Sequence, residues 1–159
     1  MIIETPKGSR NKYAFDHERR VIVLKKVLPA GMVFPYDFGF VPSTLAEDGD
    51  PIDVLVLMDE PAFPGCVLDA RLIGIIEGED DLEGDTQRND RLLAVAMVSQ
   101  AYENVKSFED LPGPLCKSIE QFFSNYPKVL SGKDYKLLGT KGVTEAQRAI
   151  DQAQSHFHR

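Results

Sequence analysis

The acidic segment 48–54, which reads Asp-Gly-Asp-Pro-Ile-Asp-Val, constrains this chain more than any other stretch of its sequence. Gly49 permits a tight reversal, and the proline that follows Asp50 biases that residue toward extended geometry. Asp53 then enters an apolar run, where a carboxylate is costly unless a partner satisfies it. With Asp48 on the same turn, the three carboxylates predict a site that attracts cations.

The donor set indicates which cations suit this segment. Oxygen ligands favour hard ions such as Mg²⁺, Mn²⁺ or Ca²⁺. A calcium loop of the EF-hand type does not fit, because Asp53 stands where that loop needs glycine and Pro51 interrupts its spacing. The alternative interpretation is an acidic turn whose carboxylates face water, and a short motif alone does not decide between the two.

Composition limits the class of protein. The 159 residues are 43% hydrophobic and 27% charged, which predicts a single globular domain over residues 1–159. A net charge of −7 argues against a nucleic-acid partner, which would need a basic face. We expect no membrane partner, because the sequence has neither a membrane-length apolar stretch nor a signal-peptide pattern. The two cysteines form no disulfide framework, so we expect a cytoplasmic protein.

The pattern along the chain predicts mostly strands, with helices late in the sequence. Strands are expected over residues 1–4, 11–16, 20–27, 52–57, 66–77, 91–98 and 133–138. Residues 29–44, rich in proline and aromatic residues, are expected to form an extended packed loop. The acidic residues 78–90 are expected to form a connection, usually a solvated hairpin, which can alternatively send one or two carboxylates to the metal site.

Three helical segments are expected in the second half of the chain. Residues 107–110 predict a short capped turn. Pro114 opens a longer helix that Pro127 is expected to end, and Thr144 with Gln147 predicts a capping box for a terminal helix. Turn-rich strands followed by helices suggest an α+β class, a mainly β protein with a small closed barrel and helices packed outside.

The chain resembles the family I soluble inorganic pyrophosphatases, as a divergent member. The resemblance covers residues 4 to about 138 and rests on the 48–54 motif together with Glu4-Thr5-Pro6, Lys12-Tyr13, Phe34-Pro35 to Gly39-Phe40, Asp90-Arg91, Phe122-Phe123 to Tyr126, and Gly132-Lys133. It implies an OB-like five-stranded closed β-barrel flanked by two helices of the C-terminal half. It also implies Mg²⁺-dependent hydrolysis of pyrophosphate by a metal-activated water, with Mn²⁺ as a substitute metal, in a homo-oligomer, often a hexamer.

The resemblance also implies roles for individual residues. Metal ligands would be Asp48, Asp53 and Asp90, and the general base Asp50. The residues that contact the phosphates would be Lys12, Lys26, Arg91, Tyr126 and Lys128, with Glu4 in support. Such a set fits the chemistry, because metals and cations offset the charge that repels a nucleophile from pyrophosphate.

Several positions depart from the family pattern. Ala14 replaces an acidic residue, Lys26 an arginine, and Phe34 and Phe38 two tyrosines, while Pro127 displaces the lysine to Lys128. These departures favour an alternative function, a non-catalytic or weakly active barrel that binds Mg²⁺ and a phosphorylated ligand. A third class, a nucleic-acid-binding OB domain, disagrees with the negative charge.

Two assignments stay open from sequence. The second metal-binding aspartate of the family corresponds to Asp80, Asp81 or Asp85 in the lengthened acidic segment. Asn89 competes with Asp90 for the position of the third ligand.

Overall fold

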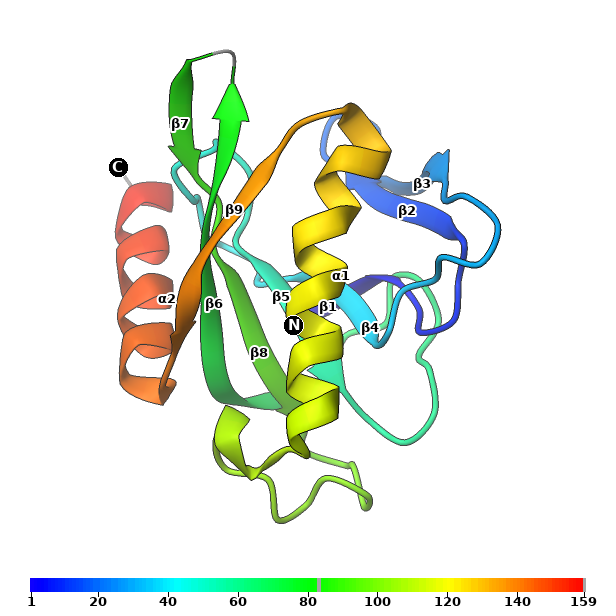
Figure 1. Ribbon diagram of the computed structural model, residues 1–159, viewed down its shortest axis with the longest axis vertical. Helices are drawn as coiled ribbons and strands as arrows, with labels where there is room; N and C mark the ends of the chain where they lie inside the picture. The colour runs from blue at the N-terminus through cyan, green and yellow to red at the C-terminus, as the bar shows by residue number, and fades with distance from the viewer. Residues whose placement is uncertain (83, 159) are drawn as a thin grey trace.

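The computed structural model describes residues 1–82 and 84–158, and it consists mostly of strands with two long helices (Figure 1). The strands are β1 (Ile2–Thr5), β2 (Asn11–Asp16), β3 (Val21–Val27), β4 (Asp37–Phe40), β5 (Asp53–Leu57), β6 (Ala70–Leu82), β7 (Asp85–Arg88), β8 (Arg91–Ala96) and β9 (Tyr135–Lys141). The helices are a 3₁₀ turn (Phe108–Asp110), α1 (Gly113–Ser131) and α2 (Val143–Phe157). Within the described residues, no helix has both the length and the apolar character needed to cross a bilayer. The mainly β fold with two helices agrees with the prediction.

The main sheet places the acidic segment beside a basic residue. Its strands follow the order β1-β4-β5-β8-β6-β7, and β9 pairs with β6. The β5–β8 pair is parallel, and its register sets Asp53 opposite Arg91. Strands β2 and β3 form a separate antiparallel ribbon. Among the described strand pairs the sheet follows an open path, so the closed five-stranded barrel stays a prediction.

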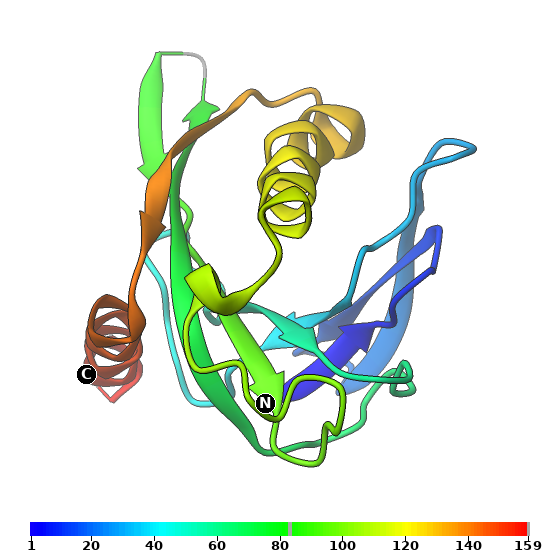
Figure 2. The same ribbon diagram turned by 60° about the horizontal axis from the view of Figure 1, so that its bottom comes forward.

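The two helices cover opposite faces of the sheet (Figures 1 and 2). Successive side chains of a strand point to opposite faces, so β5 can supply both cores. Leu55 and Leu57 pack in the cluster that includes α1, whereas Val54 and Val56 pack in the cluster that includes α2. Burial on both faces explains why this strand reads as a continuous apolar run.

The proline-rich segment 29–44 contains a regular strand, contrary to the prediction. β4 is fully buried and pairs with both β1 and β5. Gly39 allows this, because a Cβ at that position would lie only 1.9 Å from the carbonyl oxygen of Ile2. Gly39 therefore lies where the backbones of β4 and β1 approach closely, and its presence does not indicate a loop.

The acidic segment 78–90, expected as a connection in the form of a solvated hairpin, does contain a hairpin, but the strand before it does not end at residue 77 as predicted. β6 continues to Leu82, and β7 returns beside it as a hairpin. Glu79 stands opposite Arg88 on one side and Lys136 of β9 on the other. Basic cross-strand neighbours offset the charge that made the segment look like a solvated loop.

Two helix boundaries differ from the prediction. Pro127 lies inside α1, which ends instead at Gly132 in the left-handed conformation with φ of 72°. The amide of Gly132 donates to the carbonyl oxygen of Lys128 at 2.9 Å, so glycine ends the helix. α2 begins at Val143 after Gly142, which provides no side-chain cap, so the capping box predicted at Thr144 does not form.

Candidate active site

A cavity of about 460 Å³ opens where β2, β3, the start of β5, the end of β6, the start of β8 and the end of α1 meet. Its carboxylates are Glu4, Asp48, Asp50, Asp53 and Asp80. Its cations are Lys12, Lys25, Lys26, Arg91 and Lys133. Its aromatic residues are Phe15, His17, Phe38, Phe40 and Tyr126. The cavity thus combines both signs of charge with an aromatic wall.

The parallel pairing of β5 and β8 brings Asp53 and Arg91 together at the cavity floor. Arg91 Nε lies 4.0 Å from Asp53 Oδ2, and the Arg91 side chain is only 3% exposed. Burial raises the pKa of Asp53 to about 6, although Arg91 and Lys12 oppose that shift. The ionised carboxylate is therefore costly in the metal-free protein.

The acidic turn carries the next two carboxylates. The amide of Asp50 donates to Asp48 Oδ1 at 3.1 Å, and Gly49 adopts φ of 89°, which suits glycine. Burial raises the pKa of Asp48, and the nearby charges of Asp50 and Asp80 add to the shift. Asp50 itself is exposed at the rim, within reach of water.

Glu4 of β1 and Lys12 of β2 both line the cavity and interact electrostatically. Glu4 Oε1 accepts a hydrogen bond of 2.6 Å from the amide of Phe15. Burial raises the pKa of Glu4 to about 7, and the charge of Asp53 adds to this effect. Burial also lowers the pKa of Lys12, against the attraction of Asp53 and Glu4.

Aromatic rings support the two innermost cations. Lys12 Nζ lies 5.2 Å from the centre of the Tyr126 ring and 5.8 Å from that of Phe38. Arg91 Cζ lies 4.4 Å from the Tyr135 ring centre and 5.0 Å from that of Phe123. Both pairs of contacts fall within cation–π range.

Three buried polar atoms of this cavity have no hydrogen-bond partner among the described residues. They are Asp80 Oδ1, Arg91 Nε and Tyr126 Oη. Buried polar groups are normally satisfied, so each exception asks for an explanation. A charged ligand with both cations and anionic oxygens would satisfy all three.

The carboxylates suit a hydrated divalent cation. Within residues 1–82 and 84–158, no three acidic, histidine or cysteine groups already form a cluster that could hold a metal ion. Mg²⁺ usually keeps several waters and takes only one or two carboxylates directly, so it needs no such cluster. Asp80 Oδ1 has no hydrogen-bond partner among the described residues, and burial raises the pKa values of Asp48 and Asp53, so a bound cation would offset the cost of ionising these carboxylates. These three residues fit the role of metal ligands.

Comparison with known proteins identifies the family. The inorganic pyrophosphatase family matches residues 1–158 of this chain. The chain belongs to the inorganic pyrophosphatase family. An inorganic pyrophosphatase of Methanosarcina mazei is 40% identical over 157 residues, which cover 99% of this chain and 90% of that relative. An inorganic pyrophosphatase of Synechocystis sp. is 41% identical over 157 residues, with the same coverage. The crystal structure of inorganic pyrophosphatase from Thermus thermophilus has a TM-score of 0.91 at 34% identity, covering 100% of this chain and 90% of its own.

Most residues that the family resemblance singled out do lie at this cavity. The structure brings together Glu4, Lys12, Lys26, Asp48, Asp50, Asp53, Arg91 and Tyr126. Lys26 Nζ donates to the carbonyl oxygen of Leu130, near the C-terminal end of α1. That contact joins the β2–β3 ribbon to the helix. Ala14 and Phe38, two of the departures from the family pattern, also line the cavity.

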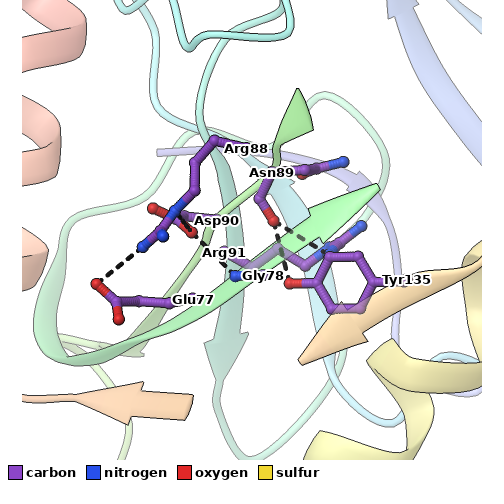
Figure 3. A network of polar contacts seen from close by, with 7 residues as sticks. All are labelled: Glu77, Gly78, Arg88, Asn89, Asp90, Arg91 and Tyr135. Carbon is purple, nitrogen blue, oxygen red and sulfur yellow. Dashed lines mark hydrogen bonds and ion pairs between the residues drawn. The ribbon is translucent and has the colours of Figure 1, made fainter. Parts of the chain in front are cut away.

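Two predicted residues lie elsewhere. Asp90 Oδ1 accepts hydrogen bonds from Arg88 Nε at 2.6 Å and from the amide of Gly78 at 3.0 Å (Figure 3), and Asp90 is not among the residues that line the cavity. Neighbouring residues of an extended chain point to opposite sides, so Asn89 rather than Asp90 lines the cavity. Lys128 pairs with an exposed Asp134 at 3.0 Å, and its own side chain is 68% exposed.

The structure also narrows the choice in the acidic segment. Asp80 lines the cavity, and its Oδ2 accepts a hydrogen bond of 2.8 Å from Asn89 Nδ2. Asp81 instead accepts from the amide of Gly84 at 3.3 Å, and Asp85 is exposed. Side chains alternate between the two faces of β6, so Asp80 and Asp81 point to opposite sides. This alternation could not be used from the sequence, because the strand was predicted to end at residue 77.

Sequence reasoning missed other residues near the site. Lys25 lines the cavity from β3, and Tyr135 supports Arg91 from β9. A tyrosine at the start of a short strand carries no sequence signal for a role at a distant arginine. Its contribution depends on the pairing of β9 with β6.

Proposed function

We propose that this inorganic pyrophosphatase family member hydrolyses pyrophosphate to two phosphates with the help of Mg²⁺, for which Mn²⁺ can substitute. The unpartnered atoms Asp80 Oδ1, Arg91 Nε and Tyr126 Oη carry this proposal. One acceptor and two donors, buried in one cavity, match a ligand that is an anion accompanied by a cation. Magnesium pyrophosphate is such a ligand.

The cations and the tyrosine would bind the substrate oxygens. Arg91 and Lys12 interact with Asp53, and the exposed Lys26 and Lys133 also line the cavity. Phosphoryl transfer depends on positioning and on charge stabilisation, which these groups provide. Tyr126 Oη would donate a further hydrogen bond, since burial raises its pKa and keeps it protonated.

The carboxylates would hold the metal and receive the proton. Asp48, Asp53 and Asp80 are the residues that would hold Mg²⁺, which supplies charge neutralisation and a lowered pKa of water. Asp50, exposed at the rim, would accept the proton of the attacking water. The binding-only alternative is not favoured, because the similar proteins are named inorganic pyrophosphatases.

The deciding experiment measures phosphate release from pyrophosphate by the purified protein. We expect release in Mg²⁺, slower release in Mn²⁺, and none with excess chelator. Nucleotides and phosphate monoesters serve as controls and should release little phosphate. Binding of magnesium and phosphate without turnover would support the non-catalytic alternative instead.

Further features of the family resemblance belong to the same proposal. We infer a single domain over residues 1–159, which should unfold in one cooperative transition. Closure of the barrel would involve β1 and β2, where Thr5 Oγ1 and the backbone of Tyr13 exchange hydrogen bonds of 3.0 Å. A homo-oligomer, with a hexamer as the expected size, can be measured by light scattering. A cytoplasmic location and the lack of nucleic-acid or membrane partners remain part of this proposal.

A further inference from the structure

Arg91 is held by aromatic rings rather than by acidic partners. The ring centres of Tyr135 and Phe123 lie 4.4 Å and 5.0 Å from its Cζ. We call these two rings the aromatic clamp. Asp53 Oδ2 is 4.0 Å from Arg91 Nε, too far for a hydrogen bond. The ring contacts themselves therefore orient a buried guanidinium without engaging Nε.

Tyr135 contacts the same segment a second time through its hydroxyl. Tyr135 Oη donates to the carbonyl oxygen of Asn89 at 3.1 Å, and Arg91 Nη1 approaches that oxygen at 3.4 Å (Figure 3). The Tyr135 ring thus contacts Arg91 directly, and the Tyr135 hydroxyl holds the backbone of Asn89, two residues before Arg91. Both contacts come from one side chain of β9.

Gly78 gives the Tyr135 ring its place. A Cβ at position 78 would lie 1.9 Å from Tyr135 Oη and 2.0 Å from its Cζ. The backbone of Gly78 also donates to Asp90 Oδ1 at 3.0 Å and accepts from the amide of Asn89 at 2.9 Å. Gly78 and Tyr135 together therefore fix segment 89–91 from two strands.

The opposite side of this segment is also fixed. Arg88 contacts Asp90 at 2.6 Å and Glu77 at 2.9 Å, on the side of the segment opposite Tyr135 (Figure 3). The segment cannot shift without breaking contacts on both sides. Arg91 Nε itself is buried and has no hydrogen-bond partner among residues 1–82 and 84–158.

We propose that Tyr135 is a positioning residue that holds Arg91 as a preformed fork for one phosphate group of the substrate. This inference rests on the proposed function and adds a residue to it. Guanidinium N–H groups bind phosphate oxygens in a planar, bidentate geometry, so their orientation decides how well they bind. A ring and a hydroxyl that fix the orientation before the substrate arrives reduce the cost of binding.

A purely structural role for Tyr135 makes a different prediction. If the ring only fills space in the core, its removal should lower the free energy of unfolding and affect binding independently of residue 91. If it orients the guanidinium, its effect should depend on the arginine. A double-mutant cycle separates these two cases.

The experiment combines Tyr135→Leu and Tyr135→Phe with Arg91→Lys, singly and together. Lysine keeps the charge but lacks the planar fork that Tyr135 is proposed to orient. The probe is methylenediphosphonate, a pyrophosphate analogue that is not hydrolysed, titrated by calorimetry at fixed Mg²⁺. KM and kcat for pyrophosphate are measured in parallel. Tyr102→Leu is the matched control, because Tyr102 is half-buried and hydrogen-bonded to Tyr36 at 3.0 Å, away from the cavity.

We expect Tyr135→Leu to weaken analogue binding about tenfold, the factor that corresponds to ~1.4 kcal/mol, and to raise KM more than it lowers kcat. Tyr135→Phe keeps the ring and should lose about threefold. In the Arg91→Lys background, Tyr135→Leu should cost about threefold or less. Tyr102→Leu should leave binding unchanged.

Additive effects in the cycle would overturn the proposal, as would unchanged analogue binding in Tyr135→Leu. If Tyr135→Leu does not fold, Tyr135→Phe alone still decides, because its loss must disappear in the Arg91→Lys background. Absence of pyrophosphate turnover by the wild-type protein would overturn the proposed function, while the binding cycle would still test the clamp. Failure of the wild-type protein to bind the analogue would overturn the fork itself.

Discussion

Asp53→Asn should stabilise the metal-free protein while it impairs turnover. Asparagine keeps the shape of the side chain but cannot ionise, so it behaves as the protonated carboxyl does. The pKa of Asp53 is raised to about 6 by burial, and this value already includes the attraction of Arg91 and Lys12. The charged form is therefore the costly one in the folded protein.

The size of the effect follows from that pKa. An increase from the ordinary value near 3.8 to about 6 costs the ionised folded state up to ~3 kcal/mol, at about 1.4 kcal/mol per pKa unit. The side chain is 31% exposed, so solvent screening reduces the expected gain to ~1–2 kcal/mol. The melting temperature in chelator should then rise by roughly 3–6 °C at pH 7.5.

The sign depends on pH in a defined way. Below the unfolded-state pKa, near ~3.9, Asp53 is protonated in both states and asparagine gives no advantage. The cost grows as pH rises from about 4 to 6 and is complete above the folded-state pKa of about 6. The stabilisation should therefore be full at pH 7.5 and shrink toward zero at pH 4.

Two assays test this prediction. Thermal unfolding in chelator at pH 7.5 and pH 4 gives the stability difference, and phosphate release in Mg²⁺ gives turnover. If Asp53 holds the metal, turnover should fall roughly 100-fold or more. Full turnover in the variant would refute the ligand role. A destabilised variant in chelator, or an equal gain at both pH values, would refute the electrostatic reasoning.

Two further predictions concern the metal-free protein and the lysines. The wild-type protein in chelator should lose stability as pH rises from about 4 to 7, because burial raises the pKa values of Glu4 and Asp53 to about 7 and about 6. Urea unfolding midpoints across that pH range measure the loss, and a midpoint that does not change with pH would contradict the prediction. Lys26→Ala should raise KM for pyrophosphate about tenfold, equivalent to ~1.4 kcal/mol, whereas Lys128→Ala should stay within about twofold because its ion pair with Asp134 is exposed. Equal effects of the two lysine substitutions would refute the placement of Lys26 at the substrate.

Much of the fold could be predicted from local pattern, and the misses have a common cause. Strands with clear alternation or apolar runs, such as β2 and β5, lie close to their predicted positions. β4 was missed because Gly39 and its prolines suggest a loop, whereas the glycine admits the backbone of Ile2. The end of β6 was missed because its charges are offset by Arg88 and by β9, which lie far away in the sequence.

In the candidate site, too, the residues that are close in sequence could be predicted, whereas those brought together by strand pairing could not. The turn 48–53 is local, so its three carboxylates could be expected to lie together. The choice of Asp80 over its neighbours depends on the register of a strand whose continuation was not predicted. Asp90 was placed at the site because the motif gave its position only to within one residue, and the alternation of side chains selects Asn89. Tyr135 contacts Asn89 across 46 residues, a distance no local pattern can bridge.

The use of aromatic rings to hold cations explains how this cavity stays ready to bind. If Arg91 were fixed by a bidentate pair with Asp53, two of its five N–H donors and both carboxylate oxygens would be engaged with each other before any ligand binds. The Nε–Oδ2 separation of 4.0 Å and the two ring contacts avoid that outcome. Arg91 keeps an unused donor, and the pKa of Asp53 stays raised even with two cations nearby. In the ligand-free protein, the ionised Asp53 and the unpaired Arg91 donor therefore reduce the free energy of unfolding, and binding of an anion together with its cation would recover that free energy.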